Sequence, residues 1–295
     1  MTTRRRFLTI LAGAAVLPTL ANAAANWRGI ALGADAQIIL DHPNADALIA
    51  SAVAEIRRLE ALFSLRQDSQ LTRLNAAGRL ANPAPEMLEL LSICGAINAR
   101  TGGAFDPTIQ PLWALYAESF AAGSTPSPAQ LAKANTGWQH VRFSPAEVSF
   151  AKPDMALTLN GIAQGFIADK IAALFRAEGV ENVLIDSGEI VAVGTAPDGA
   201  AWPVMLANSG GRVMPLSNAA IATSAPLGTT FDGAGAVGHI LDPRTRRPGG
   251  LWGQVSVSAT SAALADGLST AFCLLDAAGI RGAGSAGVLD VVTLA

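Results

Sequence analysis

The sequence predicts an α+β fold, with a single domain of antiparallel or mixed sheets and packed helices. Short strand-like runs bounded by Gly and Pro recur through the second half of the chain, a pattern typical of sheet-forming regions. Longer segments with apolar residues three and four positions apart lie among them and indicate helices. Of the 295 residues, 51% are apolar and 15% are charged, so the chain can form a large core without disulfides.

The beginning of the chain has the three parts of an export signal. A basic start at Arg4–Arg6 is followed by an apolar run at Phe7–Leu17 and a small-residue cleavage site at Ala21–Ala23. The order of the arginine pair, one further residue, Phe and Leu favours the twin-arginine route over an ordinary secretory signal. The apolar run is too short to span a bilayer. We therefore expect residues 1–23 to be a removable signal and residues 24–295 to be the mature domain, located in the periplasm.

Composition excludes one class of partner. The net charge is −3, and the chain has a single Tyr and few other aromatic residues. Nucleic-acid-binding proteins usually present excess positive charge or a stacking surface, so we expect no nucleic-acid partner. Cys94 and Cys273 lie in apolar helical patterns without the spacing of a metal or redox motif. We expect them to be buried free thiols.

The first half of the chain is mostly helical in pattern. A short strand is expected over 36–41, followed by helices over 45–64 and 85–103, the second of which ends at a Gly pair. A third helix is expected over 127–136, with a Ser as its N-cap and a Pro in its first turn.

The middle of the chain predicts a strand over 155–159, a helix over 162–179 and a strand over 182–186. We expect these to form a right-handed β-α-β unit with parallel strands. The pattern then predicts a helix within 258–276 and strands over 190–194, 202–206, 219–224, 238–242, 254–259 and 288–294.

Two predicted turns contain residues that could either bind a ligand or only shape the turn. Gly161 lies where the 155–159 strand gives way to a helix. Free amides at a helix N-terminus can bind phosphate, but a tight turn would need the same residue. Asp106 follows Gly102 and Gly103, and it fits an Asx turn as well as a Gly-lined approach to a ligand.

Two further places have the residue types of a catalytic site. His239 precedes Asp242 and three arginines, and it fits either a proton acceptor or a structural histidine. Asp266 and Thr270 lie four apart on one helix face, and their oxygens suit Mg²⁺, which binds one or two carboxylates together with phosphate oxygens. The alternative is that Thr270 bonds back to the carbonyl of Asp266 while Asp266 pairs with an arginine.

Seven stretches, taken in order, resemble the ApbE family, the FAD:protein FMN transferases. They are "FSLRQDSQLTRLN" (63–75), "GGAFDPTIQPL" (102–112), "LTLNGIAQGF" (157–166), "SGEIVAVG" (187–194), "AIATSA" (220–225), "HILDPRTRRP" (239–248) and "SATSAALADGLSTAF" (258–272). The "TLNGIAQG" form is similar to a NosX-like subgroup tied to nitrous oxide reductase maturation. The resemblance covers nearly all of the mature chain and implies an ApbE-like, T-fold-related catalytic domain.

The resemblance implies a reaction in which FMN passes from FAD, the substrate, to a Thr or Ser hydroxyl of an acceptor protein while AMP is released. It implies that Asp266 and Thr270 bind Mg²⁺ through their side chains, that Gly161 binds it through its carbonyl, and that His239 is the catalytic base. The FAD-binding positions that it implies are Leu32, Ala104, Phe105, Asp106, Thr158, Gln164 and Ile240.

The implied acceptor is a periplasmic or membrane protein with an Asp-x-Ser/Thr-Gly-Ala-Thr-like motif, so the chain reaches the membrane only through its acceptor. The chain departs from the family pattern on the FAD side. Thr158 stands where the family usually has Asp, Gln164 where it has Lys, and Leu32-Gly33-Ala34 where it has Met-Gly-Thr, and the aromatic expected after "FSL" is missing. Two alternatives therefore remain: a Mg²⁺-dependent FAD pyrophosphatase, and a non-catalytic periplasmic flavin-binding assembly protein.

Overall fold

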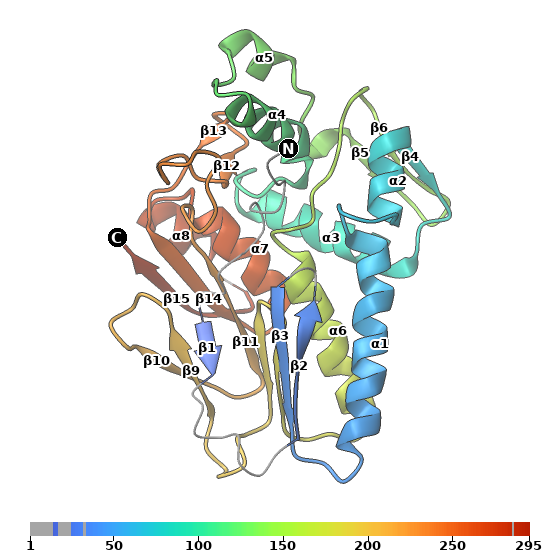
Figure 1. Cartoon of the computed structure of the whole chain (residues 1–295), viewed down its shortest axis with the longest axis vertical. Helices are drawn as coiled ribbons and strands as arrows, with labels where there is room; N and C mark the ends of the chain where they lie inside the picture. Colours follow the sequence, from blue (N-terminus) through green and yellow to red (C-terminus); the bar gives the residue numbers. More distant parts are fainter. Residues whose placement is uncertain (1–13, 17–24, 32–33, 285) are drawn as a thin grey trace.

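A seven-stranded sheet forms the centre of the fold, which the computed structural model describes for residues 14–16, 25–31, 34–284 and 286–295 (Figure 1). The strand order is β15-β14-β11-β8-β7-β3-β2, and every neighbouring pair in it is antiparallel. The strands are β2 (Ala25–Ala31), β3 (Ala34–Leu40), β7 (Val183–Asp186), β8 (Ile190–Val193), β11 (Ala219–Ser224), β14 (Gln254–Ala259) and β15 (Val288–Leu294).

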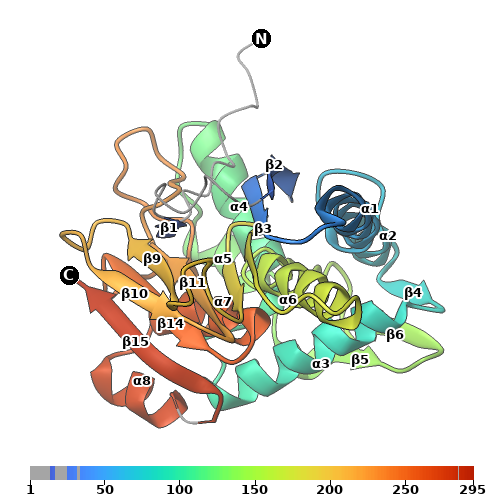
Figure 2. The same ribbon diagram turned by 90° about the horizontal axis from the view of Figure 1, so that it is seen from below.

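Helices cover one face of this sheet. Helices α6 (Ala163–Ala177) and α7 (Ala262–Phe272) pack against each other, and α7 contacts β11 and β14. Helix α1 (Ala45–Phe63) packs on α6, and α3 (Pro85–Arg100) packs on α7 (Figure 2). The main hydrophobic core lies between these helices and the sheet, and its largest fully buried side chains include Phe166.

A β-hairpin covers the opposite face. Strands β9 (Trp202–Leu206) and β10 (Val213–Leu216) bury Trp202 against the apolar side chains of β7, β8 and β11 that face away from the helices. Strand β1 (Ala14–Val16) pairs with the other edge of β9. These three residues belong to the predicted export signal, the rest of which lies outside the described residues.

Smaller elements surround the core. One group, next to α1 and α3, contains α2 (Gln70–Ala77) and an antiparallel sheet of β4 (Arg79–Ala81), β6 (Glu147–Phe150) and β5 (Val141–Phe143). Another group contains η2 (Pro107–Ile109), α4 (Gln110–Ala121), α5 (Pro128–Lys133), η3 (Trp138–His140), β12 (Leu241–Asp242) and β13 (Arg247–Pro248), and α8 (Ala277–Ala283) precedes the last strand. We call α4, α5 and the 225–248 loop the cap.

The cap has its own apolar cluster. Tyr116 and Phe120 of α4 stack with Phe231, with ring centroids 5.5 and 6.2 Å from that of Phe231. Leu112, Leu131 and Leu241 complete the cluster. This packing fixes the loop that carries His239 relative to α4.

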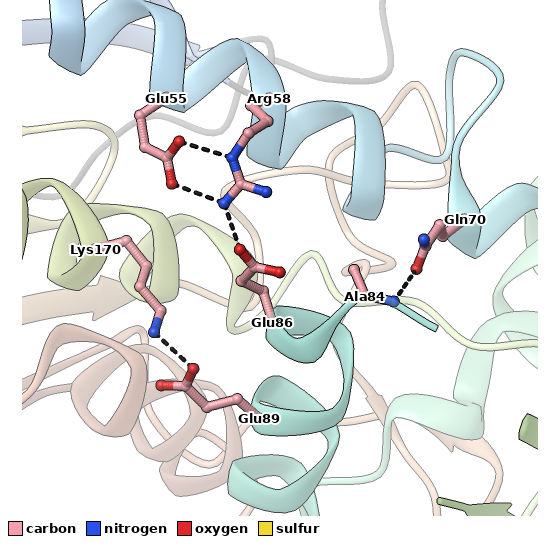
Figure 3. A network of polar contacts seen from close by, with 7 residues as sticks. All are labelled: Glu55, Arg58, Gln70, Ala84, Glu86, Glu89 and Lys170. Carbon is pink, nitrogen blue, oxygen red and sulfur yellow. Dashed lines mark hydrogen bonds and ion pairs between the residues drawn. The ribbon is translucent and has the colours of Figure 1, made fainter. Parts of the chain in front are cut away.

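A network of surface ion pairs ties α1, α3 and α6 together (Figure 3). Arg58 of α1 donates to Glu55 at 2.7 Å and also to Glu86 of α3. Lys170 of α6 lies 2.6 Å from Glu89, one turn further along α3. Exposed pairs of this kind contribute about 1 kcal/mol or less each to the free energy of unfolding. The apolar core therefore determines how the three helices pack, and the ion pairs only help to align them.

The expected parallel β-α-β unit is wrong. Residues 155–159 form an extended loop, because their amides bond to helical segments and not to a strand: Leu157 donates to Asn75 Oδ1 of α2 at 2.7 Å, and Thr158 donates to the Pro107 carbonyl of η2 at 2.8 Å. The second strand, β7, pairs antiparallel with β3 and β8. Met155, Leu157 and Leu159 are buried at alternate positions, which reproduces the strand pattern without a partner strand.

Two other boundaries differ from expectation. Of the strand expected over 238–242, only β12 is present, since His239 and Ile240 lie in the irregular part of the cap loop. The helix within 258–276 begins at Ala262, because Ser261 caps it by accepting from the Leu264 amide.

Most other elements agree with the sequence pattern. The single α+β domain is confirmed, as are strands β9, β11, β14 and β15, whose residues match the expected spans. Helix α5 begins with the expected Ser127 cap and Pro128. Cys94 and Cys273 are buried free thiols. Within the described residues, no helix has the length and apolar character needed to cross a membrane.

Candidate active site

A cavity of about 540 Å³ lies where the ends of α6, α7 and β11 meet the cap. Small-molecule sites typically have volumes of roughly 300–1,000 Å³. Its apolar walls include Phe63, Leu65, Phe105, Trp113 and Ile240, and its polar groups include Gln164, Glu189, His239, Asp266 and Thr270. The cavity therefore combines a large apolar surface with a few convergent polar groups, as a ligand site requires.

Asp266 is a carboxylate at the bottom of this cavity. It is 3% exposed and accepts a hydrogen bond of 3.2 Å from the Gly165 amide at the start of α6. Burial raises the pKa of Asp266 to about 7. None of the ion pairs in the described part of the chain includes Asp266, so the alternative of an arginine partner is wrong.

Close packing of α6 on α7 sets this geometry. A Cβ added at Gly165 would lie 2.3 Å from the Ala262 carbonyl oxygen, so only glycine lets the two backbones approach. Asp169, one turn further along α6, accepts from the Ala262 and Ala263 amides at 2.8 and 2.9 Å and thereby caps α7. This capping carboxylate was not among the residues predicted from the sequence.

Thr270 lies one turn after Asp266 and faces the same cavity. The bond back to the Asp266 carbonyl is made by Ser269 at 3.0 Å, whereas the Thr270 hydroxyl lies 3.3 Å from the Ser224 hydroxyl. A Cβ added at Gly161 would lie 3.0 Å from Thr270 Oγ1. The structure thus brings together Gly161, Asp266 and Thr270, as the sequence suggested.

These three residues fit a divalent cation. A buried carboxylate without a cationic partner, a hydroxyl and a glycine backbone at close approach are hard oxygen donors of the kind that Mg²⁺ prefers. Among the described residues, no group of three or more His, Cys, Asp or Glu side chains forms a metal cluster. A cation here would therefore also need oxygens from a phosphate ligand or water.

His239 lies at the cap side of the cavity. Its Nδ1 is 3.0 Å from the Thr229 carbonyl oxygen, which can only accept, so Nδ1 carries the proton of the neutral ring and Nε2 has the lone pair; the Pro226 carbonyl also lies close to the ring. Burial lowers the pKa of His239 below its usual value, which keeps the ring neutral at pH 7. Asp242 is ion-paired with Arg244 at 2.8 Å, and its pKa is lowered, so it is poorly suited to accept a proton.

The "GGAFDP" segment forms one wall. Ala104, Phe105 and Asp106 all line the cavity. Asp106 accepts from the Thr108 amide at 2.9 Å and from the Trp138 amide at 3.1 Å. The Asx turn expected at Asp106 is therefore present. The Asp106 carboxylate bonds to backbone amides and thereby holds the wall of the cavity in place.

Three other predicted FAD-side residues also line the cavity: Thr158, Gln164 and Ile240. Gln164 is 5% exposed, and its Nε2 donates to the Ser187 carbonyl at 3.2 Å. Leu32 lies outside the described residues.

Glu189 is a cavity residue that the sequence analysis did not select. It lines the cavity, is 6% exposed and precedes the fully buried strand β8. Burial and the nearby charges of Asp266 and Asp186 hold the pKa of Glu189 well above its usual range. The sequence feature that could have indicated Glu189 is an acidic residue directly before a wholly apolar strand. An exposed turn before a buried strand has the same sequence pattern.

Comparison with known proteins agrees with this geometry. The family model described as "ApbE family" matches residues 32–289. The FAD:protein FMN transferase of Salmonella typhimurium is 30% identical over 233 residues, which cover 72% of this chain and 67% of the relative. That of Treponema pallidum is 30% identical over 245 residues, covering 72% and 68%.

Solved structures share the fold. The apo form of the flavinyl transferase ApbE from Pseudomonas stutzeri has a TM-score of 0.78 at 25% identity and covers 92% of this chain and 94% of its own. The ApbE protein from Thermotoga maritima has a TM-score of 0.81 at 24% identity, with coverage of 92% and 94%. The fold and the relatives define a flavin-transferring enzyme. The chain belongs to the ApbE family.

Proposed function

We propose that this chain is an FAD:protein FMN transferase that uses Mg²⁺ to move FMN from FAD to a Thr or Ser hydroxyl of an acceptor protein, releasing AMP. The curated relatives that carry this activity name support the transferase class. The observation that carries the proposal is the buried Asp266 carboxylate. It faces a cavity of ligand size without a cationic partner in the described structure, and the same cavity contains His239.

In the proposed reaction His239 is the base. Its Nε2 takes the proton of the acceptor hydroxyl, since Nδ1 is already committed to the Thr229 carbonyl. The acceptor oxygen forms a bond to the phosphorus on the FMN side of the FAD pyrophosphate. The bond from that phosphorus to the bridging oxygen breaks, and AMP leaves with the bridging oxygen.

Asp266, Thr270 and Gly161 are the proposed ligands of Mg²⁺, which when bound would neutralise phosphate charge during transfer. The walls formed by Phe105, Ile240 and Trp113 give the apolar area that a flavin or adenine ring needs. Gln164 and Thr158 are neutral residues on this side of the cavity, so FAD would be bound here by packing and uncharged hydrogen bonds.

The proposed location is the periplasm, reached by the twin-arginine route after the 1–23 signal is read. The acceptor is a periplasmic or membrane protein with an Asp-x-Ser/Thr-Gly-Ala-Thr-like motif. Arg4–Arg6 and the apolar run after them support the route.

One incubation separates the three functional hypotheses. The mature chain is mixed with FAD, Mg²⁺ and a peptide that carries the acceptor motif. Flavin covalently attached to the peptide, with one AMP per flavin, is the result expected of a transferase. AMP with free FMN and unmodified peptide would instead indicate a pyrophosphatase, and bound but unchanged FAD would indicate a flavin-binding assembly protein.

A further inference from the structure

Glu189 and Asp266 approach the same cavity from different parts of the fold. Asp266 comes from the middle of α7, whereas Glu189 ends the turn between β7 and β8. Both line the cavity, and they are 6% and 3% exposed. Two carboxylates are thus buried at one site, and within the described residues neither of them forms an ion pair.

The end of β11 links Glu189 to the hydroxyl of Thr270. The Thr223 amide donates to the Glu189 carboxylate, and the next residue, Ser224, has its hydroxyl 3.3 Å from Thr270 Oγ1. Successive residues of one strand therefore contact Glu189 and the helix face that carries Asp266. The Glu189 carboxylate therefore borders the same cavity as Asp266 and Thr270, near enough to Asp266 for the charge of that residue to raise the pKa of Glu189.

The turn that carries Glu189 is held in place. The Ser187 amide donates to the Glu189 carbonyl at 3.1 Å, and Gln164 Nε2 donates to the Ser187 carbonyl at 3.2 Å. Gly188 has a φ of +98°, and a Cβ there would lie 2.5 Å from Gln164 Nε2. The turn therefore needs glycine, and the Gln164 amide braces it from α6.

We propose that Glu189 is a second carboxylate of the cation site formed by Asp266, Thr270 and Gly161, so that a divalent cation is held between two anionic groups. The inference rests on the proposed function, because it presupposes that a cation binds at Asp266. A buried pair of carboxylates is costly in the absence of a compensating charge, and Mg²⁺ is bound by one or two carboxylates together with phosphate oxygens. A dication at this point offsets both charges.

The test measures cation binding directly, with Mn²⁺ as the probe and electron paramagnetic resonance as the readout, on the mature chain without FAD. Glu189→Gln keeps the size of the side chain and removes its charge. We expect Mn²⁺ affinity to fall by about tenfold or more, with a melting temperature in EDTA that is equal to or higher than that of the wild type. Glu181→Gln, an exposed carboxylate before β7, is the matched control and should bind Mn²⁺ as the wild type does.

Asp266→Asn separates the proposed cation site itself from the added role of Glu189 in that site. If Asp266→Asn loses Mn²⁺ while Glu189→Gln binds it with wild-type affinity, Glu189 is not part of the site and the proposed function stands. If Asp266→Asn also keeps wild-type affinity, the cation assignment itself fails. If Glu189→Gln does not fold, Glu189→Asp takes its place. The shorter carboxylate should bind Mn²⁺ more weakly than the wild type, and unchanged affinity overturns the inference.

Discussion

The Gly165 amide donates to the Asp266 carboxylate across the contact between α6 and α7, at 3.2 Å. The first turn of one helix thereby orients the only buried acid of the next. This single backbone bond leaves the remaining lone pairs of the carboxylate free to face the cavity. The position of Asp266 is consequently as fixed as the packing of α6 on α7.

Replacement of Asp266 by Ala should abolish cation-dependent flavin transfer. We expect a loss of roughly 100-fold or more, the scale for removal of a key electrostatic group. The measurement is the single-turnover rate of covalent flavin formation at saturating Mg²⁺. Asp276→Ala, which removes the cap of α8, controls for general destabilisation. A near-normal rate for Asp266→Ala in Mg²⁺ would contradict the metal assignment.

His239→Asn separates catalysis from binding. Asn keeps hydrogen-bonding capacity but cannot accept a proton near neutral pH, so transfer should fall by roughly 100- to 10,000-fold. FAD affinity and melting temperature should change little, since the base acts on the acceptor hydroxyl. Three measurements on this variant decide the role: the transfer rate, the FAD dissociation constant and the melting temperature. If the transfer rate and the melting temperature fall while the FAD dissociation constant rises, His239 is a structural residue.

Gly161→Ala tests the close approach of the turn before α6 to Thr270. The new methyl group would lie 3.0 Å from Thr270 Oγ1 and must displace it. We expect Mg²⁺ to be needed at roughly tenfold higher concentration for half-maximal transfer. Gly233→Ala, in open space within the cap loop, should leave the Mg²⁺ requirement unchanged. Equal requirements in both variants would exclude Gly161 from the site.

Stability without metal should depend on the protonation of Asp266. The pKa of Asp266 is raised to about 7 in the folded chain, against an ordinary value of about 3.9 when unfolded. Between about pH 4 and pH 7 the folded state holds a proton that the unfolded state has lost, so the free energy of unfolding decreases as pH rises through this window. Melting temperatures in EDTA should show this decrease, and the slope should shrink in Asp266→Asn and in Mg²⁺. If the melting temperature in EDTA falls with pH equally steeply in the wild type and in Asp266→Asn, the titrating group is not Asp266.

Arg4→Lys with Arg5→Lys should block export and leave a folded protein in the cytoplasm. The twin-arginine receptor reads the arginine pair itself, so conservation of charge does not rescue transport. Fractionation followed by immunoblotting measures this outcome, and Arg28→Lys serves as a control outside the signal. Normal periplasmic levels of the double variant would point to the general secretory route.

Sequence patterns correctly predicted the elements whose limits are set by neighbouring residues in the chain. β9 and β14 were predicted with correct limits because turn residues bound them on both sides. The 155–159 segment was assigned as a strand because an extended loop buried at alternate positions has the same period of two. No local signal distinguishes the two cases, since the difference is whether another strand pairs with it.

The candidate site was predictable to a similar degree. Asp266 was identifiable from the sequence because a carboxylate within an apolar helix is rarely buried without a partner. In the described structure it has no ionic partner. Glu189 was not identified, because a Ser-Gly-Glu turn is ordinary on a protein surface. Its burial depends on the end of β11 and on Gln164, which lie far away in the sequence.

The cavity takes its polar groups from the start of α6, the β7–β8 turn, the end of β11, the cap loop and α7. These segments are far apart in the sequence and come together only through the tertiary packing of the sheet, the helices and the cap. A ligand that binds in the cavity therefore stabilises the whole domain, by RT ln(1 + [L]/Kd) for free ligand in excess. Occupancy and global folding are thus thermodynamically linked, and a loaded chain would resist proteolysis throughout the elements that pack around the cavity.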